Sequence, residues 1–282
     1  MNNSIEICRS VAGIAFRTRR LRAQGLKVGF VPTMGALHEG HASLLKAAFE
    51  QSDVVVCSLY PNPTQFDNKE DLKKYPRTEE EDLELLQREK VALAYIPNTA
   101  DIYHNLEVTP IDYGRLTNSL EGAHRPGHFD GMSTIVRRLL EIVTPDLAFF
   151  GEKDWQQLAI INHMNSTEGL GVSIISCPII REPSGLAMSS RNRRLLEEEV
   201  LRALAISELV MTASAWSKTM SPSQIQAKGE ELLVAAGLQV DYVSVVNAKS
   251  FEFTEEFNTA QSYRILIAAY CGDVRLIDNG AI

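Results

Sequence analysis

Two histidines three residues apart, His38 and His41, are the side chains of this sequence best placed to do chemistry. They open a predicted helix that follows a β-prone run at residues 28–31 and a turn containing Gly35. The first N–H groups of a helix have no partner within it, and the helix dipole attracts negative charge to the same end. Side chains at i and i+3 share a face. The pattern therefore predicts two ring donors beside a phosphate-binding helix start, which favours nucleotide chemistry.

Zinc binding is the alternative for a histidine pair on a helix. The metalloprotease pattern, however, spaces its histidines four residues apart and includes a glutamate base. Here the spacing is three, with Glu39 and Gly40 between the histidines. The tetrapeptide H-x-G-H is a weak signal by itself. The preceding strand, Gly35 and further motifs downstream favour an anion site.

A proline-stiffened loop follows the second predicted strand and contains Asn62 and Gln65. Its two prolines restrict the backbone and prevent a helix from continuing, so these amides are held in fixed positions. The amide of Gln65 both donates and accepts hydrogen bonds, which suits the hydroxyl and carboxylate groups of a small ligand. Taken alone, a simple proline turn explains the loop equally well.

The segment after the fourth predicted strand begins at Gly151, which allows a ligand to approach the backbone closely. Lys153 supplies a flexible positive charge for a phosphate. Asp154 either caps the next helix or contacts a ribose or a metal. Gln157 lies one turn further and is expected to face the same cleft as Gln65. A solvated helix start without a ligand is the alternative.

Residues 181–192 combine serines, arginines and a predicted helix start, a set that can clamp a polyanion. The alternative is a Ser/Asn helix cap in an inter-domain loop. Three segments of this chain suit an anion, however, and it is improbable that all three are structural features without a ligand. The polar residues 68–77 form either an exposed loop or a lid. Residues 121–131, rich in glycine and histidine, are expected to line the site without a catalytic role.

Predicted strands and helices alternate through the first two thirds of the chain. The strands are expected at residues 28–31, 53–59, 91–96, 147–150 and 172–176. The helices are expected at residues 40–51, 79–89, 131–143 and 154–166, with a capping box at Thr78 and a cap at Asp130. This alternation is typical of an α/β fold with a doubly wound parallel sheet, which binds ligands at the carboxyl ends of its strands.

The pattern changes near residue 180. Helices are expected at residues 195–212 and 223–236, the second capped by Ser221-Pro222. Three β-prone runs follow at residues 240–246, 263–271 and 274–277, the last two joined by a Gly272-Asp273 hairpin turn. We therefore predict a catalytic domain at residues 1–180 and a small α+β domain at residues 181–282.

Composition excludes several classes of partner. The chain of 282 residues carries a net charge of −8, which makes it a poor partner for nucleic acid or an anionic membrane. Its four dispersed cysteines predict buried thiols in a reducing compartment. No apolar run approaches the roughly 20 residues that span a bilayer. The arginine-rich start is interpreted as an amphipathic helix that ends before Gly25 rather than as a transit peptide, so a cytoplasmic protein is expected.

Together the motifs resemble those of the pantothenate synthetase (pantoate–β-alanine ligase) family. They are PTMGALHEGH at 32–41, NPTQF at 62–66, YPRT at 75–78, RPGHFDGM at 125–132, GEKDWQQL at 151–158 and GLAMSSRN at 185–192. The first and last are the family's versions of the two ATP signatures shared with class I aminoacyl-tRNA synthetases and related nucleotidylyltransferases. The resemblance implies a Rossmann-like N-terminal domain that carries the active site, a smaller C-terminal lid domain and a homodimer.

The resemblance also implies roles for individual residues. The implied ATP-binding residues are Met34, Gly35, Ala36, Leu37, His38, Glu39, Gly40, His41, Gly151, Glu152, Lys153, Asp154, Ile180, Met188, Ser189, Ser190 and Arg191. The implied catalytic residues are His38, His41, Lys153, Ser189, Ser190 and Arg191, with His41 as the acid. Gln65 and Gln157 are implied to bind pantoate, with β-alanine near Gln65. Mg²⁺ is implied to arrive with ATP, without a metal site on the protein.

The implied reaction joins (R)-pantoate and β-alanine through a pantoyl adenylate, giving pantothenate for coenzyme A biosynthesis, AMP and pyrophosphate. One alternative is a related synthetase with another acceptor. A tRNA acceptor is disfavoured because the chain is short, acidic and lacks an evident anticodon-binding module. Another alternative is a non-catalytic nucleotide-binding regulator, against which the intact His38, His41 and Lys153 argue. The chain departs from the common family pattern at Tyr60-Pro61 and at Ser184.

Overall fold

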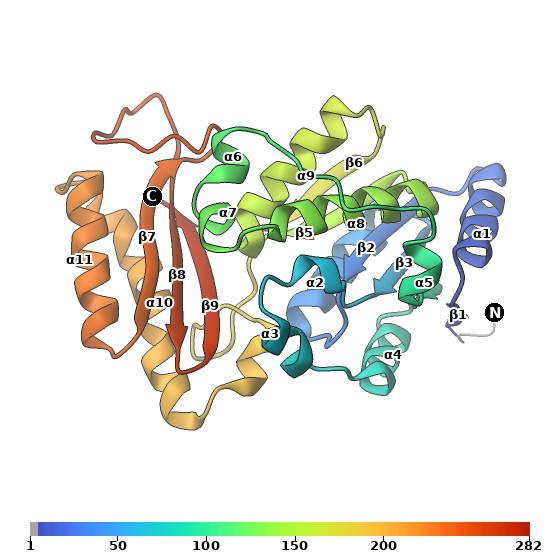
Figure 1. Ribbon diagram of the computed structural model, residues 1–282, viewed down its shortest axis with the longest axis horizontal. Helices are drawn as coiled ribbons and strands as arrows, with labels where there is room; N and C mark the ends of the chain where they lie inside the picture. Colours follow the sequence, from blue (N-terminus) through green and yellow to red (C-terminus); the bar gives the residue numbers. More distant parts are fainter. Residues whose placement is uncertain (1–4) are drawn as a thin grey trace. The chain divides into compact units, whose positions relative to one another are not determined.

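The chain forms two compact units, seen in a computed structural model that describes residues 5–282 (Figure 1). Unit 1 comprises the described chain up to Tyr113 together with Arg125–Glu152 and Gln156–Pro178. Unit 2 comprises Gly114–His124, Lys153–Trp155 and Ile179–Ile282. Two short segments within the first 180 residues, Gly114–His124 and Lys153–Trp155, therefore belong to unit 2 and are called the first and second excursions. The predicted single division after residue 180 assigns both of them to the first domain.

Unit 1 is built on a six-stranded parallel sheet of order β1-β4-β3-β2-β5-β6. Its strands are β1 Glu6–Cys8, β2 Val28–Thr33, β3 Val54–Leu59, β4 Leu93–Tyr95, β5 Leu147–Gly151 and β6 Ser173–Cys177. Strand order reverses between β2 and β5, and the carboxyl side of such a switch point is where open α/β sheets bind ligands. The predicted doubly wound α/β fold is confirmed. Strand β1 was not predicted, because three residues are too few to show a pattern.

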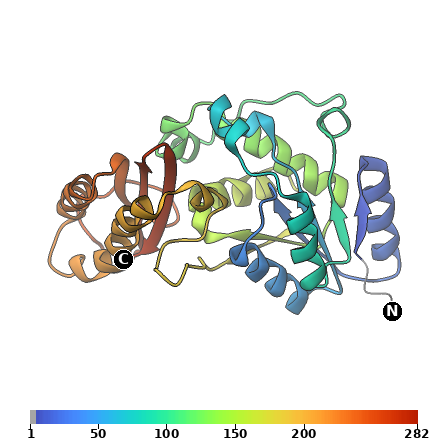
Figure 2. The same ribbon diagram turned by 90° about the horizontal axis from the view of Figure 1, so that it is seen from below.

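Helices cover both faces of this sheet. They are α1 Val11–Ala23, α2 Glu39–Gln51, α3 Lys69–Lys74, α4 Glu79–Arg88, α5 Thr99–Ile102, α8 His128–Val143 and α9 Trp155–Thr167, with 3-10 turns η1 Pro63–Gln65 and η2 Glu152–Asp154. Helices α2 and α4 bury Leu45 and Leu86 in a core on one face, and α8 lies on the other face (Figure 2). The near-continuous burial of β3 follows from cover on both sides. Residues 68–77, interpreted as a loop or lid, include α3.

Two predicted helix caps are wrong, each because the side chain binds another group instead of the free N–H groups of the helix start. The Thr78 hydroxyl donates to Asp82 Oδ1 at 3.2 Å instead of capping the backbone of α4. Helix α8 begins at His128, after Gly127 in the left-handed region (φ +78°), so Asp130 lies inside its first turn. The Asp130 carboxylate accepts from the Ile111 N–H at 2.9 Å.

Unit 2 is built on an antiparallel sheet of three strands in the order β7-β8-β9. Its strands are β7 Gln239–Asn247, β8 Tyr263–Cys271 and β9 Val274–Ala281; its helices are α6 Arg115–Asn118, α7 Glu121–His124, α10 Glu197–Trp216 and α11 Pro222–Ala235, with the 3-10 turn η3 Ser190–Arg194. The hairpin turn at Gly272 (φ +59°) and the Ser221 cap of α11 are as predicted. No helix among residues 5–282 has the length and apolar character needed to cross a membrane.

The two faces of this sheet have different neighbours. After the bulge between Val240 and Tyr242, the side chains of Val243 and Val245 on β7 pack with Ile265 and Leu276 into the core under α10 and α11. Alternate residues along a strand point to opposite faces. The other face therefore carries Arg275 and Asn279, which hold the two excursions that join unit 2. Helices α6 and α7 lie on the opposite side of the sheet from α11 (Figure 1).

Candidate active site

The turn between β2 and α2 is held in place by a buried aspartate. Gly35 and Ala36 both adopt positive φ (+77° and +50°), which turns the chain sharply after β2. Asp82, 3% exposed, accepts the backbone N–H of Ala36 at 2.9 Å through Oδ2 and that of Leu37 at 2.7 Å through Oδ1. Asp82 was not predicted, because its only signal was membership of the acidic start of α4. Its contacts make it the anchor of the His38–His41 turn.

His38 and His41 lie at the start of α2 with their ring centroids 4.1 Å apart. His38 Nδ1 accepts the Gly40 N–H at 3.1 Å, and His41 Nδ1 accepts the His38 N–H at 3.3 Å. A neutral imidazole whose Nδ1 accepts carries its proton on Nε2. The backbone of the helix start therefore sets both rings as Nε2–H donors, which is the donor pair the spacing predicted. Met34 lies in the turn before them, and Glu39 and Gly40 belong to the first turn of α2.

The loop after β3 carries Gln65 at the end of η1, half-buried. Asn62, which the sequence pattern placed beside Gln65 as a second ligand group, is 1% exposed and serves the fold instead. Its Nδ2 donates to the Gly131 carbonyl at 3.2 Å, and its Oδ1 accepts from the Tyr103 hydroxyl at 2.7 Å. A Cβ on Gly131 would lie 2.0 Å from the Thr64 carbonyl oxygen, so only glycine lets α8 approach this loop.

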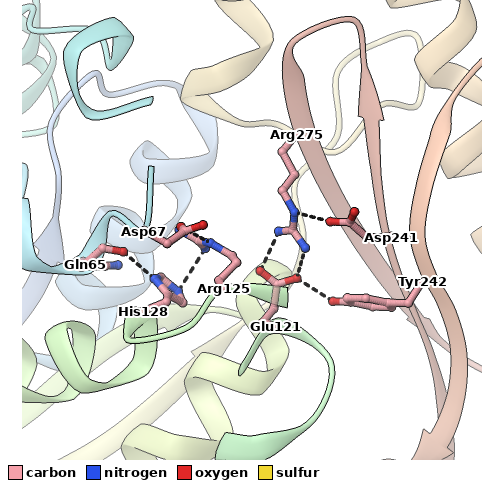
Figure 3. Close-up of polar contacts among 8 residues, drawn as sticks. All are labelled: Gln65, Asp67, Glu121, Arg125, His128, Asp241, Tyr242 and Arg275. Carbon is pink, nitrogen blue, oxygen red and sulfur yellow. Dashed lines mark hydrogen bonds and ion pairs between the residues drawn. The ribbon is translucent and has the colours of Figure 1, made fainter. Parts of the chain in front are cut away.

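A chain of polar contacts fixes the main chain of Gln65 from α8 (Figure 3). The His128 Nδ1–H donates to the Gln65 carbonyl at 2.7 Å, and Arg125 donates to His128 Nε2 at 3.1 Å. Arg125 in turn donates through Nε to Asp67 at 2.9 Å. The donating guanidinium determines the tautomer, because it leaves Nε2 as acceptor and the proton on Nδ1. The RPGHFDGM segment, for which no catalytic role was predicted, thus positions the Gln65 loop.

Three neighbouring strands of unit 1 end in predicted site segments. Strand β2 leads to His41, β3 leads to Gln65, and β5 leads through Gly151 and Glu152 to Gln157 in the first turn of α9. Because β3, β2 and β5 are parallel neighbours, their carboxyl ends lie along one edge of the sheet. This edge includes the switch point, where the topology predicts a ligand.

Unit 1 also has a cavity away from this edge of the sheet. It has a volume of about 540 Å³ and is lined by Glu6, Arg17, Val54 and Leu93 among others. Val54 and Leu93 are the first residues of β3 and β4. The cavity therefore opens at the amino ends of the strands, opposite the edge that carries the predicted site residues.

The remaining predicted residues belong to unit 2. Lys153 and Asp154 lie in η2, and Ser189 caps η3, where its hydroxyl accepts the Arg191 N–H at 3.3 Å. Ser190, buried, and Arg191 open η3. Met188 pairs with Ile180 through a 2.9 Å backbone hydrogen bond. Lys153 and Ser189, 36 positions apart in sequence, line the same cavity of about 10 Å³, so the structure brings these two predicted ATP segments together within unit 2.

A buried charge cluster ties the first excursion to the sheet of unit 2 (Figure 3). Arg275 donates to both carboxylate oxygens of Glu121 at 2.7 and 2.8 Å, and through Nε to Asp241 at 2.7 Å. The Tyr242 hydroxyl donates to Glu121 at 2.7 Å. Burial, followed by the Glu121 charge, raises the pKa of Tyr242 well above its ordinary value. Burial opposes the charge of Arg275, but hydrogen bonds and charge from Glu121 and Asp241 prevail and raise its pKa.

A family model described as "Pantoate-beta-alanine ligase" matches residues 6–281, nearly the whole chain. The chain belongs to this family. Its activity is the ATP-dependent ligation of pantoate and β-alanine in pantothenate biosynthesis. The pantothenate synthetase of Bacteroides fragilis is 44% identical over 260 residues, covering 92% of each chain. That of Paracoccus denitrificans is 41% identical over 98% of each chain.

Solved structures of the family share the whole fold. The pantothenate synthetase of Thermus thermophilus has a TM-score of 0.90 and 35% identity, covering 98% of both chains. The Francisella tularensis pantoate–β-alanine ligase, complexed with β,γ-ATP and β-alanine, has a TM-score of 0.84 and 34% identity, covering 99% of this chain and 98% of that one. The predicted family, fold class and ligase activity are thus confirmed. The roles assigned to single residues stay predictions.

Proposed function

We propose that the ligase works in two steps through an acyl adenylate. The pantoate carboxylate attacks the α-phosphorus of ATP, the bond to the β-phosphate oxygen breaks, and pyrophosphate leaves. The β-alanine amine then attacks the acyl carbon, the bond to AMP breaks, and the amine loses a proton as the amide forms. The mixed anhydride is already activated, so no protein nucleophile is needed. The protein contributes positioning and charge stabilisation.

The observation that carries this proposal is the orientation of His38 and His41. Both rings use Nδ1 to accept backbone N–H groups of the helix start, which leaves Nε2–H as the donor. Donors fixed in advance need no reorganisation when charge develops on a phosphate oxygen. We assign His41 as the catalytic donor and acid, supported by the α2 N-terminus beside it.

We assign pantoate to Gln65 and Gln157, which follow the ends of β3 and β5 on either side of β2. Their neutral amides suit a ligand that carries both hydroxyl groups and a carboxylate. β-Alanine is assigned a place near Gln65, and the Francisella tularensis relative is a ligase complexed with β,γ-ATP and β-alanine.

Unit 2 supplies the cationic groups of the proposed mechanism. We assign Lys153 and Arg191 to the phosphates, with the Ser189 and Ser190 hydroxyls as further donors. Among residues 5–282, no three His, Cys, Asp or Glu side chains form a cation cluster. We propose that Mg²⁺ enters on the oxygens of ATP as part of the substrate, because phosphate oxygens are the hard ligands that this cation prefers.

The order of the two steps is tested with substrate omission. Pantoate alone is expected to support exchange of labelled pyrophosphate into ATP, whereas net AMP formation requires β-alanine as well. Exchange that needs β-alanine would contradict the adenylate intermediate. Turnover that depends on added tRNA would favour the related-synthetase alternative, and binding of ATP without any AMP formation would favour the regulator.

We also propose a cytoplasmic homodimer. All four cysteines are free and buried, which suits a reducing compartment. Light scattering after size-exclusion chromatography is expected to give twice the chain mass of 31.3 kDa. A single-chain mass at working concentrations would refute the dimer.

A further inference from the structure

Two adjacent polar residues near the end of β9, Asp278 and Asn279, are almost completely buried at 3% and 2% exposure. Buried polar groups are retained where they satisfy partners that would otherwise lose water contacts. Neighbouring residues of a strand point to opposite faces of the sheet. Asp278 and Asn279 therefore reach different segments of unit 2 from one place in β9, although no sequence motif connects β9 with the active site.

Asn279 holds the excursion that contains Lys153. Its Nδ2 donates to the Lys153 carbonyl at 2.9 Å, and its Oδ1 accepts from the Arg264 guanidinium. That guanidinium lies 3.6 Å from the ring centroid of Trp155, whose Nε1 donates to the Ala248 carbonyl at 3.2 Å. The main chain of Lys153 is thus fixed on one side by the amide of Asn279 and two residues later by a stacked tryptophan.

Asp278 holds the loop that leads to Ser189. It accepts two hydrogen bonds from the Arg181 guanidinium, at 2.6 and 3.1 Å, and the same guanidinium donates to the Gly185 carbonyl at 3.2 Å. Asp278 Oδ1 also accepts the Asn279 N–H at 2.8 Å. The carboxylate therefore links the start of the loop, its tip and the neighbouring asparagine.

The two contacts converge on one cavity. The cavity of about 10 Å³ that Lys153 and Ser189 share is also lined by Asp278. A bidentate arginine–carboxylate pair whose carboxylate is buried, and a buried amide with both ends satisfied, define position more strictly than exposed contacts do. Displacement of a reacting group by about 1 Å can cost roughly 100-fold in rate.

We propose that Asp278 and Asn279 are positioning residues for adenylation: Asn279 sets the place of Lys153, and Asp278 sets the place of the Ser189–Arg191 turn. The proposal rests on the roles assigned above to Lys153 and Ser189. Neither Asp278 nor Asn279 is a catalytic residue, because each acts through the main chain or side chain of another residue.

The test is Asn279→Asp, which keeps the acceptor for Arg264 but replaces the donor to the Lys153 carbonyl with a second acceptor. Pantoate-dependent ATP–pyrophosphate exchange is expected to fall about 10- to 100-fold in kcat, with the KM for pantoate within about twofold of wild type. Asn165→Asp is the matched control, because Asn165 Nδ2 donates to the Val172 carbonyl at 2.8 Å in unit 1. The control is expected to lose stability but keep its kcat.

Asp278→Asn is the second variant, and it tests the proposal even if Asn279→Asp folds poorly. Its control is Asp146→Asn, because Asp146 likewise accepts from an arginine, Arg22, and from a backbone N–H, that of Val28. The kcat of exchange is expected to fall about tenfold in Asp278→Asn and to stay unchanged in the control. The activity of each variant is normalised to its folded fraction, which circular dichroism measures.

Lys153→Ala separates failure of this inference from failure of the proposed function. If Lys153→Ala abolishes exchange while Asn279→Asp and Asp278→Asn lose only stability, the positioning inference is overturned and the proposed site stands. If Lys153→Ala itself exchanges normally, the role of Lys153 is wrong, and the inference built on it falls as well. Loss of kcat in all three variants, with both controls active, supports the inference.

Discussion

The two units hold their site segments in different ways. In unit 1 the segments follow directly from the ends of neighbouring parallel strands, and side chains of neighbouring helices fix two of them, Asp82 for the His38–His41 turn and His128 for the Gln65 loop. In unit 2 the corresponding segments are not strand ends of the sheet that holds them. They are attached to the antiparallel sheet by Asn279 and by buried ion pairs.

This contrast explains why the site segments were easier to predict than the contacts that hold them. A strand end delivers a loop to the sheet edge by topology alone, so a local pattern reveals the site. A segment attached from the side depends on partners about a hundred residues away, as Arg181 depends on Asp278 (|i−j| = 97). Such partners carry no local signal. Substitutions in both units test the contrast, and the most damaging is expected in unit 2.

Arg275→Met should be the most damaging substitution. It leaves Glu121 and Asp241 buried without their cation, and breaking a buried pair in this way typically costs about 3–5 kcal/mol of unfolding free energy. Urea denaturation measures the loss. The double variant Arg275→Met with Glu121→Gln should recover part of it, because one uncompensated charge is removed. A single variant as stable as wild type would show that the charge cluster does not hold the first excursion.

His41→Ala should reduce turnover with little effect on stability. Loss of one charge-stabilising donor typically costs about 2.7–4 kcal/mol of transition-state stabilisation, or roughly 100- to 1000-fold in kcat. AMP formation measures turnover, and thermal melting checks the fold. The exposed His104 provides the control, because His104→Ala removes an imidazole outside the proposed site. Near-normal turnover of His41→Ala would remove His41 from its role.

Asp82→Asn should affect both stability and ATP use. Its amide presents N–H groups in place of one of the two oxygens that accept from Ala36 and Leu37, and one backbone N–H left unsatisfied in this buried place costs about 1–3 kcal/mol. We expect a loss of that size in urea, together with a higher KM for ATP. Thr78→Val removes a single contact to Asp82 and should produce a smaller change in the same direction. Equal effects from both variants would contradict the anchoring role of Asp82.

His128→Ala should have the mildest effect, on pantoate binding alone. Gln65→Ala removes the proposed ligand group and should weaken pantoate binding while ATP affinity is largely retained. His128→Ala leaves the Gln65 amide in place and releases the Gln65 carbonyl together with the Arg125 contact, so the loss of pantoate affinity should be a fraction of that, about 0.5–1.5 kcal/mol for the hydrogen bond to the carbonyl. Isothermal titration measures both affinities. Weaker ATP binding with unchanged pantoate binding would contradict both assignments.

Much of the fold was predictable because unit 1 follows local rules. The strands β2, β3 and β5 are apolar runs bounded by turns, and the Gly272 hairpin and Ser221 cap of unit 2 are equally local. Prediction failed where a side chain bound another group instead of the helix start: Thr78 binds the Asp82 carboxylate one turn into α4, and Asp130 accepts from the Ile111 N–H, 19 positions away. The excursions at residues 114–124 and 153–155 were missed because long-range contacts assign them to unit 2.

Residue types at short spacing were enough to predict the candidate site segments, the parallel sheet that ends in them and the family to which the chain belongs. The strand and helix periods translate such spacing directly into position. The side chains that hold those segments became evident only in the folded chain. Asp82, His128, Asp278 and Asn279 act across gaps of 45, 63, 97 and 126 positions, and such distances are closed by packing rather than by local backbone preference.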